Sequence, residues 1–220
     1  MPVSLILYDL DGTLANTKQD LAVAVNRTLA QLDLPTRSHE ELYGFVGNGV
    51  RMLLSRAGGG ESDPSALSHA IEVFRSHYMA HLTDHTTLYP GVDEVLSAHS
   101  HLQQAIVTNK PMGYTEGVVT NLGLAQRVGL VLGGDSTPHL KPNPAILHAA
   151  LDHFGVTPDQ AVMVGDGLPD LGAARAAGIR CALLTCGMGD PKALQAAEPD
   201  YLFGNITELI PTIASLNGQS

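Results

Sequence analysis

Cysteine and basic residues are both scarce in this chain. Only two of its 220 residues are cysteine, Cys181 and Cys186. Two cysteines form neither a disulfide framework nor a four-ligand zinc site, so we interpret both as reduced structural thiols. The 12 lysines and arginines are outnumbered by 22 aspartates and glutamates, for a formal net charge of −10 with histidine neutral. This charge argues against nucleic acid and anionic membrane surfaces as partners, so an anionic ligand must rely on local positive charge.

Long apolar segments and low-complexity tracts are also missing. No stretch of about 18 uninterrupted apolar residues occurs, and the start shows no basic segment followed by an apolar one. These absences predict a soluble cytoplasmic protein. No repeats or long charge runs occur, so no segment has the character of a disordered arm. With 44% hydrophobic residues, the chain can form the core of one large or two smaller domains.

The first apolar run of the chain leads to two carboxylates. An uncharged run over residues 3–7 predicts a strand buried on both faces, and Gly12-Thr13 marks the turn after it. Asp9 and Asp11 therefore fall at the carboxyl end of the strand, where open α/β sheets bind their ligands. A surface Asp-Gly turn is the alternative interpretation.

A hydroxyl and a lone lysine follow the next two apolar runs. Thr108 ends the run 105–107 and can donate to a phosphoryl oxygen without adding charge, although a hydroxyl after a strand more often caps a helix. Lys141 stands between a loop and a helix that proline begins. Its ammonium can neutralise a phosphate as a point charge, and a solvent-exposed lysine is the alternative.

A second pair of acids follows the apolar run 161–164. Asp166 comes directly after Gly165, and Asp170 follows four residues later at the predicted start of a helix. Residues four apart on a helix lie close together, so the two carboxylates are expected on one side of it. Asp170 could instead compensate the helix N-terminus, but that interpretation leaves Asp166 unexplained.

Together these motifs resemble those of the haloacid dehalogenase superfamily of aspartate-nucleophile phosphatases. The four motifs extend over most of the chain and lie at residues 9–13, 108–109, 141 and 165–170. Within the superfamily the likeness is greatest to bacterial phosphoglycolate phosphatases, on residues 45–49 and on residues 133–136 before Lys141-Pro142. Gly167, where relatives often carry serine, and Leu168-Pro169 depart from the pattern. They remove no catalytic group but can alter the hydrogen bonds around Asp166.

The chemistry of phosphoryl transfer suggests a role for each acid. A phosphate ester repels an anionic nucleophile, so the site needs positive charge, and Mg²⁺ suits a set of oxygen ligands. We expect Asp9, Asp166 and the backbone carbonyl of Asp11 to bind Mg²⁺. Asp9 is the expected nucleophile, which forms an aspartyl-phosphate. Asp11 is expected to protonate the leaving alkoxide and then to accept a proton from the attacking water.

The remaining motif residues are expected to hold the substrate. Thr108 and Lys141 would bind the transferring phosphoryl oxygens, with Asn109 beside them. Asp170 would orient Lys141 or a metal-bound water rather than bind the metal itself, because such outer carboxylates commonly fix the groups that do.

The hydrophobic pattern divides the chain into two parts. Residues 17–83 contain several helical patterns and no strand-like run, which predicts an inserted all-helical cap domain. Residues 1–16 and 84–220 form the predicted α/β core, with helices near 113–122, 143–154, 168–177 and 206–215. Alternating strands and helices predict a Rossmann-like, doubly wound parallel sheet. Since the insert leaves the core just after Asp11, it can close over the site as a mobile lid.

The predicted cap has one segment suited to choosing the substrate. Glycines on either side of Asn48 allow close backbone approach, and a helix N-terminus follows them. Arg51 could pair with a substrate carboxylate such as that of glycolate. A turn between helices with a solvated Arg51 is the alternative.

The predicted function is Mg²⁺-dependent hydrolysis of a small anionic phosphate ester through an aspartyl-phosphate, with 2-phosphoglycolate as the expected substrate. Another small phosphate ester, pyrophosphate, or a sugar-phosphate mutase reaction like that of β-phosphoglucomutase remain alternatives, because fold and core motifs do not set the substrate. Asp11 argues against a dehalogenase, since that type lacks the second aspartate. A non-catalytic binding protein is a further alternative, disfavoured by the intact motifs. The protein is expected to be a monomer or a homodimer.

Overall fold

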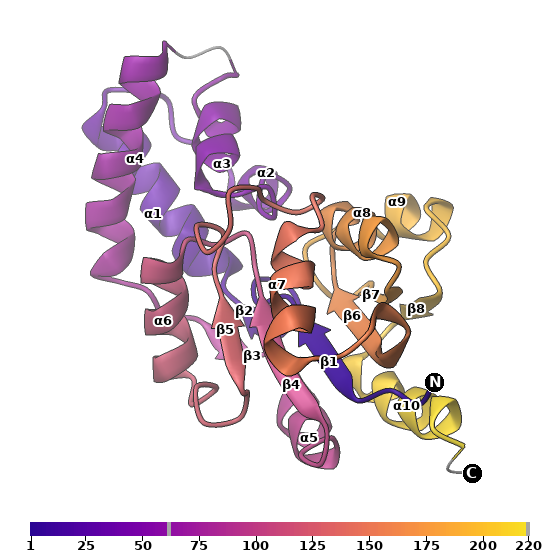
Figure 1. Ribbon diagram of the computed structural model, residues 1–220. Coiled ribbons are helices and arrows are strands. Elements are labelled where there is room, and N and C mark those ends of the chain that lie inside the picture. Colours follow the sequence, from indigo (N-terminus) through magenta and orange to yellow (C-terminus); the bar gives the residue numbers. More distant parts are fainter. Residues whose placement is uncertain (61–62, 219–220) are drawn as a thin grey trace.

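The centre of the molecule is a parallel sheet of six strands. The computed structural model describes residues 1–60 and 63–218. The strands lie in the order β5-β4-β1-β6-β7-β8, and every neighbouring pair is parallel (Figure 1). Their bounds are β1 Leu5–Tyr8, β4 Gln103–Val107, β5 Leu130–Leu132, β6 Ala161–Gly165, β7 Arg180–Leu184 and β8 Tyr201–Phe203. The strand order reverses direction at β1, so β1 lies at the switch point where such sheets bind ligands.

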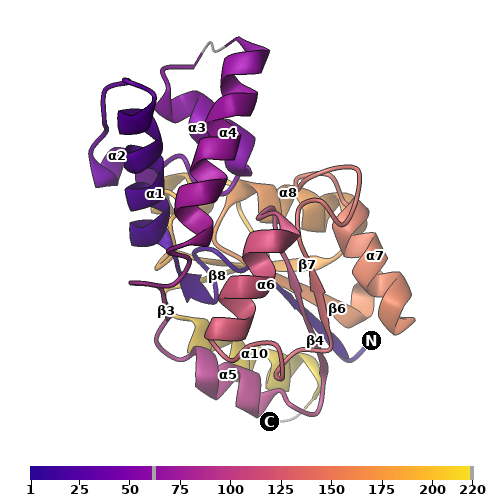
Figure 2. The ribbon, with the colours of Figure 1, turned by 90° about the vertical axis from the view of Figure 1, so that its left-hand side faces the viewer.

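Both faces of the sheet are covered by helices. Leu5 and Leu7 of β1 face one apolar core, while Ile6 and Tyr8 face the other, as the two-residue period of a strand requires. One core includes side chains of α7 (Ala145–Phe154) and α8 (Leu168–Ala177), and the other includes side chains of α5, α6 and α10 (Figure 2). Helix α5 spans Val92–Ala98, α6 spans Met112–Asn121 and α10 spans Leu209–Leu216. A further helix, α9, spans Pro191–Ala196. The predicted doubly wound parallel sheet is confirmed.

The helix positions agree closely with the sequence pattern. Helices α6 and α8 lie within one residue of their predicted ranges. Helix α7 begins at Ala145 rather than 143, because Pro144 directly precedes it as its N-cap. The range 206–215 is divided into a short 3₁₀ turn, Ile206–Glu208, followed by α10. A second 3₁₀ turn spans Pro158–Gln160 before β6.

Four helices follow one another between β1 and α5 and lie together beside the sheet (Figure 1). They are α1 Lys18–Gln31, α2 His39–Tyr43, α3 Val50–Ala57 and α4 Pro64–Met79. Within residues 17–60 and 63–83 the structure has helices and turns but no strand, in line with an all-helical insert. The division of the chain into core and cap at these limits stays a prediction.

A two-stranded antiparallel ribbon stands where the four helices join the rest of the chain. Its strands are β2 Ala15–Asn16 and β3 Thr87–Leu88, with Asn16 opposite Thr87. The ribbon brings the two connecting segments side by side, next to the carboxyl end of β1. Among the described residues, no helix combines the length and the apolar character needed to cross a membrane.

Candidate active site

Asp9 occupies the central position of the site. It follows β1, and its backbone N–H donates to the carbonyl of Val164 at 2.9 Å, which extends the parallel ladder by one residue. Its carboxylate accepts from the backbone N–H of Leu10 at 2.8 Å and lies 3.1 Å from Nζ of Lys141. The side chain of Asp9 is held from two sides and still lines the cavities described below.

Asp9, Asp166 and Asp170 form a compact group of buried carboxylates, with ligand oxygens that lie within 4.8 Å of one another. Burial, followed by the charges of Asp9 and Asp170, raises the pKa of Asp166 well above its usual range. Burial raises the pKa of Asp170 to about 6, although the neighbouring Lys141 lowers it. The three carboxylates can carry more negative charge than the ammonium of Lys141 offsets, and the atoms that they offer to a metal ion are all oxygens. These features fit a hard divalent cation such as Mg²⁺.

Glycines allow the backbone to close tightly around Asp166. Gly12 has a φ of +87°, and a side chain built there would collide with the Asp166 carboxylate. A side chain at Gly187 would collide with the same residue from the opposite loop. The backbone N–H of Met188 then donates to Oδ2 of Asp166 at 2.6 Å, and the Thr13 hydroxyl reaches Oδ1 at 3.4 Å. The Asp166 carboxylate is therefore fixed in direction by the surrounding loops.

Lys141 is buried among three oxygen acceptors. Its Nζ donates to Oδ1 of Asp170 at 2.7 Å and to the carbonyl of Val107 at 2.8 Å, besides its ion pair with Asp9. Burial lowers the pKa of Lys141, but Asp170 and Asp9 outweigh it and hold the pKa above its usual value. The ammonium is thus charged and lies next to Asp9, the candidate nucleophile.

Asp170 and Asn109 both serve to hold Lys141. The second oxygen of Asp170 accepts from the backbone N–H of Gly167 at 3.1 Å, so both of its oxygens have partners. Asn109 accepts from the backbone N–H of Lys141 at 2.8 Å and donates to its carbonyl at 3.0 Å. Its amide also donates to the carbonyl of Gly47 at 3.0 Å, which links the core to the loop before α3. Thr108 is buried next to it and lines the same cavity as Asp9.

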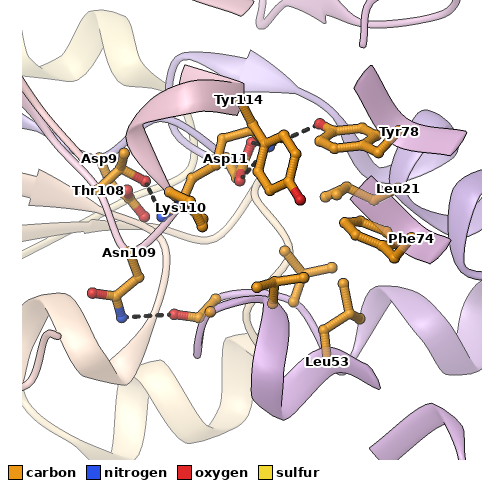
Figure 3. A pocket seen from close by; sticks show the side chains of 15 residues that line it. Asp9, Asp11, Leu21, Leu53, Phe74, Tyr78, Thr108, Asn109, Lys110 and Tyr114 are labelled. Atoms are coloured by element: carbon orange, nitrogen blue, oxygen red, sulfur yellow. Dashed lines mark hydrogen bonds and ion pairs between the residues drawn. The ribbon is translucent and has the colours of Figure 1, made fainter. Parts of the chain in front are cut away.

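Lys110 is a site residue that the sequence reasoning missed. Its Nζ donates to both carboxylate oxygens of Asp11 at 3.0 Å and to the hydroxyl of Tyr78 at 2.8 Å (Figure 3). Burial lowers the pKa of Lys110, but Asp11 and Tyr78 outweigh it and raise the pKa above its usual value. The Thr17 hydroxyl donates to Asp11 at 2.7 Å. The only signal for Lys110 in the sequence was its place two residues after Thr108.

Two cavities open beside Asp9 and Asp11. The inner cavity lies between the core and α1, α3 and α4, where Lys110 and Thr108 face apolar side chains such as Leu53 and Phe74 (Figure 3). The outer cavity lies on the side of Asp166 and Asp170, and Asn48 lines it. Arg51 is exposed and lines neither of these two cavities.

The unusual residues Gly167, Leu168 and Pro169 line the outer cavity. Gly167 holds Asp170 through its backbone N–H, which serine at this position would also offer. The departure from serine therefore removes a hydroxyl at the cavity wall and leaves the bond to Asp170 in place.

Comparison with known proteins agrees with this geometry. Residues 6–184 match the family model described as haloacid dehalogenase-like hydrolase. The chain belongs to this family. The resemblance that the four motifs predicted is thereby confirmed, and with it the expectation of a hydrolase.

Haloacid dehalogenase-like hydrolases similar to this chain include several with a more specific name. A protein of Colwellia psychrerythraea named phosphoglycolate phosphatase is 36% identical over 213 residues, covering 93% of this chain and 94% of that protein. One of Thiobacillus denitrificans with the same name is 39% identical over 184 residues, covering 81% of each chain. A crystal structure described as a predicted phosphoglycolate phosphatase from Haemophilus somnus matches with a TM-score of 0.88 at 30% identity, covering 96% of this chain and 97% of that one.

Proposed function

We propose that this hydrolase cleaves 2-phosphoglycolate to glycolate and phosphate, with Asp9 as the nucleophile. The observation that carries the proposal is the position of the Asp9 carboxylate at the end of β1, 3.1 Å from the buried ammonium of Lys141 and within the group of three carboxylates. A carboxylate held beside fixed positive charge is equipped to attack a phosphoryl group. The relatives' common name supports the choice of substrate.

Asp9 and Asp166, with the backbone carbonyl of Asp11, are the residues that would hold Mg²⁺. The bound cation would neutralise charge on the phosphoryl oxygens. Asp170 contributes differently, because Lys141 and the N–H of Gly167 already occupy its two oxygens. It orients Lys141, while Lys141 and Thr108 bind the oxygens of the transferring group.

Asp11 is the residue that handles the proton. Its carboxylate lines the inner cavity, where the Thr17 hydroxyl and the Lys110 ammonium fix its orientation. From there it protonates the departing alkoxide as the phosphoryl group moves to Asp9. It then accepts a proton from the water that opens the aspartyl-phosphate. One group serves both steps because the alkoxide leaves the phosphorus on the same side from which the water later attacks it.

The size of the inner cavity favours a small leaving group. Its volume is about 40 Å³. The outer cavity is much larger, at about 450 Å³. A short leaving group such as glycolate suits the smaller space better than a sugar does. This observation favours phosphoglycolate over the sugar-phosphate substrates of a mutase.

The proposal is tested by measuring phosphate release from 2-phosphoglycolate and from a panel of larger phosphomonoesters. The expected result is release that depends on Mg²⁺, stops with chelator, is greatest for 2-phosphoglycolate and is lost in Asp9→Asn. Asp152→Asn makes the same chemical change on the exposed side of α7 and should leave the rate unchanged. Highest activity on a larger ester would overturn the choice of substrate, and full activity of Asp9→Asn would overturn the mechanism.

A further inference from the structure

The two cavities beside Asp11 differ sharply in charge. Asp9 and Asp11 line both cavities, and the other charged side chains of the outer cavity are all acidic: Glu40, Asp166, Asp170 and Asp190. Within the described residues, neither lysine nor arginine lines it, and Lys110 is the single basic side chain that lines the inner cavity. A leaving group with its own negative charge is therefore repelled more strongly on the outer side, and Lys110 favours its binding on the inner side.

The walls of the inner cavity strengthen this attraction. Apolar side chains from α1, α3 and α4 and from the loop before α3 line this cavity together with Lys110, among them Leu21, Leu53 and Phe74 (Figure 3). In such a poorly polarisable environment a carboxylate is unstable without a cation partner, and its attraction to one is correspondingly stronger. Lys110 is the ammonium available to a carboxylate in this cavity, once that carboxylate replaces one of the acceptors on Asp11 or Tyr78 to which Nζ donates.

The spacing of Lys110 and Asp11 matches a very short leaving group. Nζ of Lys110 lies 3.0 Å from both oxygens of Asp11, the residue that protonates the ester oxygen. In 2-phosphoglycolate a single methylene separates the ester oxygen from the carboxylate. The cation that binds this carboxylate must therefore lie directly beside the proton donor, as Lys110 does.

Tyr78 offers a second donor at the same point. Its hydroxyl accepts from Nζ of Lys110 at 2.8 Å, and a hydroxyl that accepts one hydrogen bond can still donate its own proton. The ring of Tyr78 lies under the same ammonium, with 4.7 Å between Nζ and the ring centroid. Tyr78 belongs to α4, so the core and the helical insert each contribute one donor.

We propose that Lys110, assisted by the hydroxyl of Tyr78, binds the carboxylate of the leaving group and so selects 2-phosphoglycolate over uncharged esters. The inference rests on the proposed function and names the group that recognises its substrate. It also gives Lys110 the role that the sequence suggested for Arg51, which is exposed and lines neither cavity.

The test compares two substrates that differ only at the recognised group. Ethyl phosphate replaces the carboxylate of 2-phosphoglycolate with a methyl group and leaves the phosphoryl chemistry unchanged. We expect Lys110→Met to lower kcat/KM for 2-phosphoglycolate about 10- to 100-fold more than for ethyl phosphate, the range of a charged hydrogen bond. Tyr78→Phe, which removes one oxygen and keeps the packed ring, should show the same preference to a smaller extent.

Two control variants separate recognition from general charge effects. Lys192→Met removes one positive charge from the exposed face of α9, and Arg51→Met removes the charge that the sequence suggested. Both should change kcat/KM for the two esters by the same factor. A selective loss in Arg51→Met would overturn the proposal.

The remaining outcomes distinguish a failure of the recognition proposal from a failure of the proposed function. If the wild type hydrolyses both esters and Lys110→Met and Tyr78→Phe each lower the two rates by equal factors, Lys110 serves only to hold Asp11 and the recognition proposal is overturned. If the wild type releases phosphate from neither ester, the proposed function itself fails. Because Tyr78→Phe is a minimal change, it decides the question even where Lys110→Met fails to fold.

Discussion

Lys141 and Asp170 form a buried ion pair with 2.7 Å between Nζ and Oδ1. The same ammonium lies 3.1 Å from Asp9, so the direction in which Asp170 holds it decides how it faces the proposed nucleophile. The pair therefore connects the start of α8 to the end of β1 through one side chain.

Asp170→Asn should weaken catalysis without removing any group that contacts the phosphoryl oxygens. The amide keeps the size of the side chain but not its charge, so Lys141 loses its shortest ion pair and is oriented less firmly. We expect kcat/KM to fall about 10- to 100-fold, the usual cost of removing a partner that orients a catalytic group. Steady-state kinetics beside Asp152→Asn checks this, and an unchanged rate would show that Asp170 does not position Lys141.

Asp166→Asn should leave the metal-free protein at least as stable as the wild type. Burial and the charges of Asp9 and Asp170 raise the pKa of Asp166, so the folded protein binds this proton more tightly than the unfolded chain. Ionising Asp166 therefore costs stability, and the cost grows as pH rises from the ordinary carboxyl pKa through the raised value. Urea unfolding at pH 7 in the presence of chelator measures the unfolding free energies of the two proteins. A clearly lower value for Asp166→Asn than for the wild type would contradict the expected repulsion.

Mg²⁺ should raise the Tm of the wild type more than the Tm of Asp166→Asn. A ligand that binds only the folded state at a hundred times its Kd stabilises by about 2.7 kcal/mol, which raises Tm by roughly 5–10 °C at this chain length. We expect the wild type to show such a shift in a thermal unfolding experiment and Asp166→Asn to show little or none. Equal shifts in both proteins would place the cation elsewhere.

Asp20 is expected to tie α1 to the segment before β3. Its buried carboxylate accepts from the Thr86 hydroxyl at 2.7 Å, from the His85 ring at 2.8 Å and from the His85 backbone N–H at 3.0 Å. Asp20→Ala leaves these donors without their acceptor, at an expected cost of about 2–4 kcal/mol in unfolding free energy. Gln19→Ala on the exposed side of α1 is the matched control.

The contribution of Asp20 should also depend on pH. Burial raises its pKa, but the hydrogen bonds from Thr86 and His85 outweigh this and leave the pKa below its usual value. A lowered acid pKa stabilises the folded state fully above the ordinary carboxyl pKa of about 3.9, and this stability is lost as pH falls through the lowered value. The difference between wild type and Asp20→Ala should therefore be constant near neutrality and shrink below about pH 4. A constant difference at all pH values would argue for packing alone.

The sequence predicted the parts of the site that short-range patterns determine. Asp9, Thr108 and Asp166 each follow an apolar run, and a buried strand ends where the run ends, so their meeting at one sheet edge follows from the parallel order. The parallel sheet and the helices on both faces were predicted for the same reason, because strand and helix periods differ.

The parts that were missed depend on contacts between distant segments. The bond between Lys110 and Tyr78 joins a core loop to α4, and nothing near either residue specifies it. Asn109 likewise reaches the carbonyl of Gly47 across 62 positions of the chain. Arg51 lies on the exposed side of α3 because Leu53 and Leu54 determine which face of that helix is buried. Such orientations emerge only when the helices pack.

The central claim is that the phosphoryl group is transferred to the carboxylate of Asp9. Trapping this aspartyl-phosphate tests the claim most directly. Wild-type protein is mixed with 2-phosphoglycolate and Mg²⁺, quenched within the first turnover and treated with borohydride, which reduces an aspartyl-phosphate to homoserine. The account predicts homoserine at position 9 in peptide mass spectra, and none at position 11 or in samples without substrate. Phosphate release without homoserine at position 9, or with homoserine at another aspartate, would contradict it.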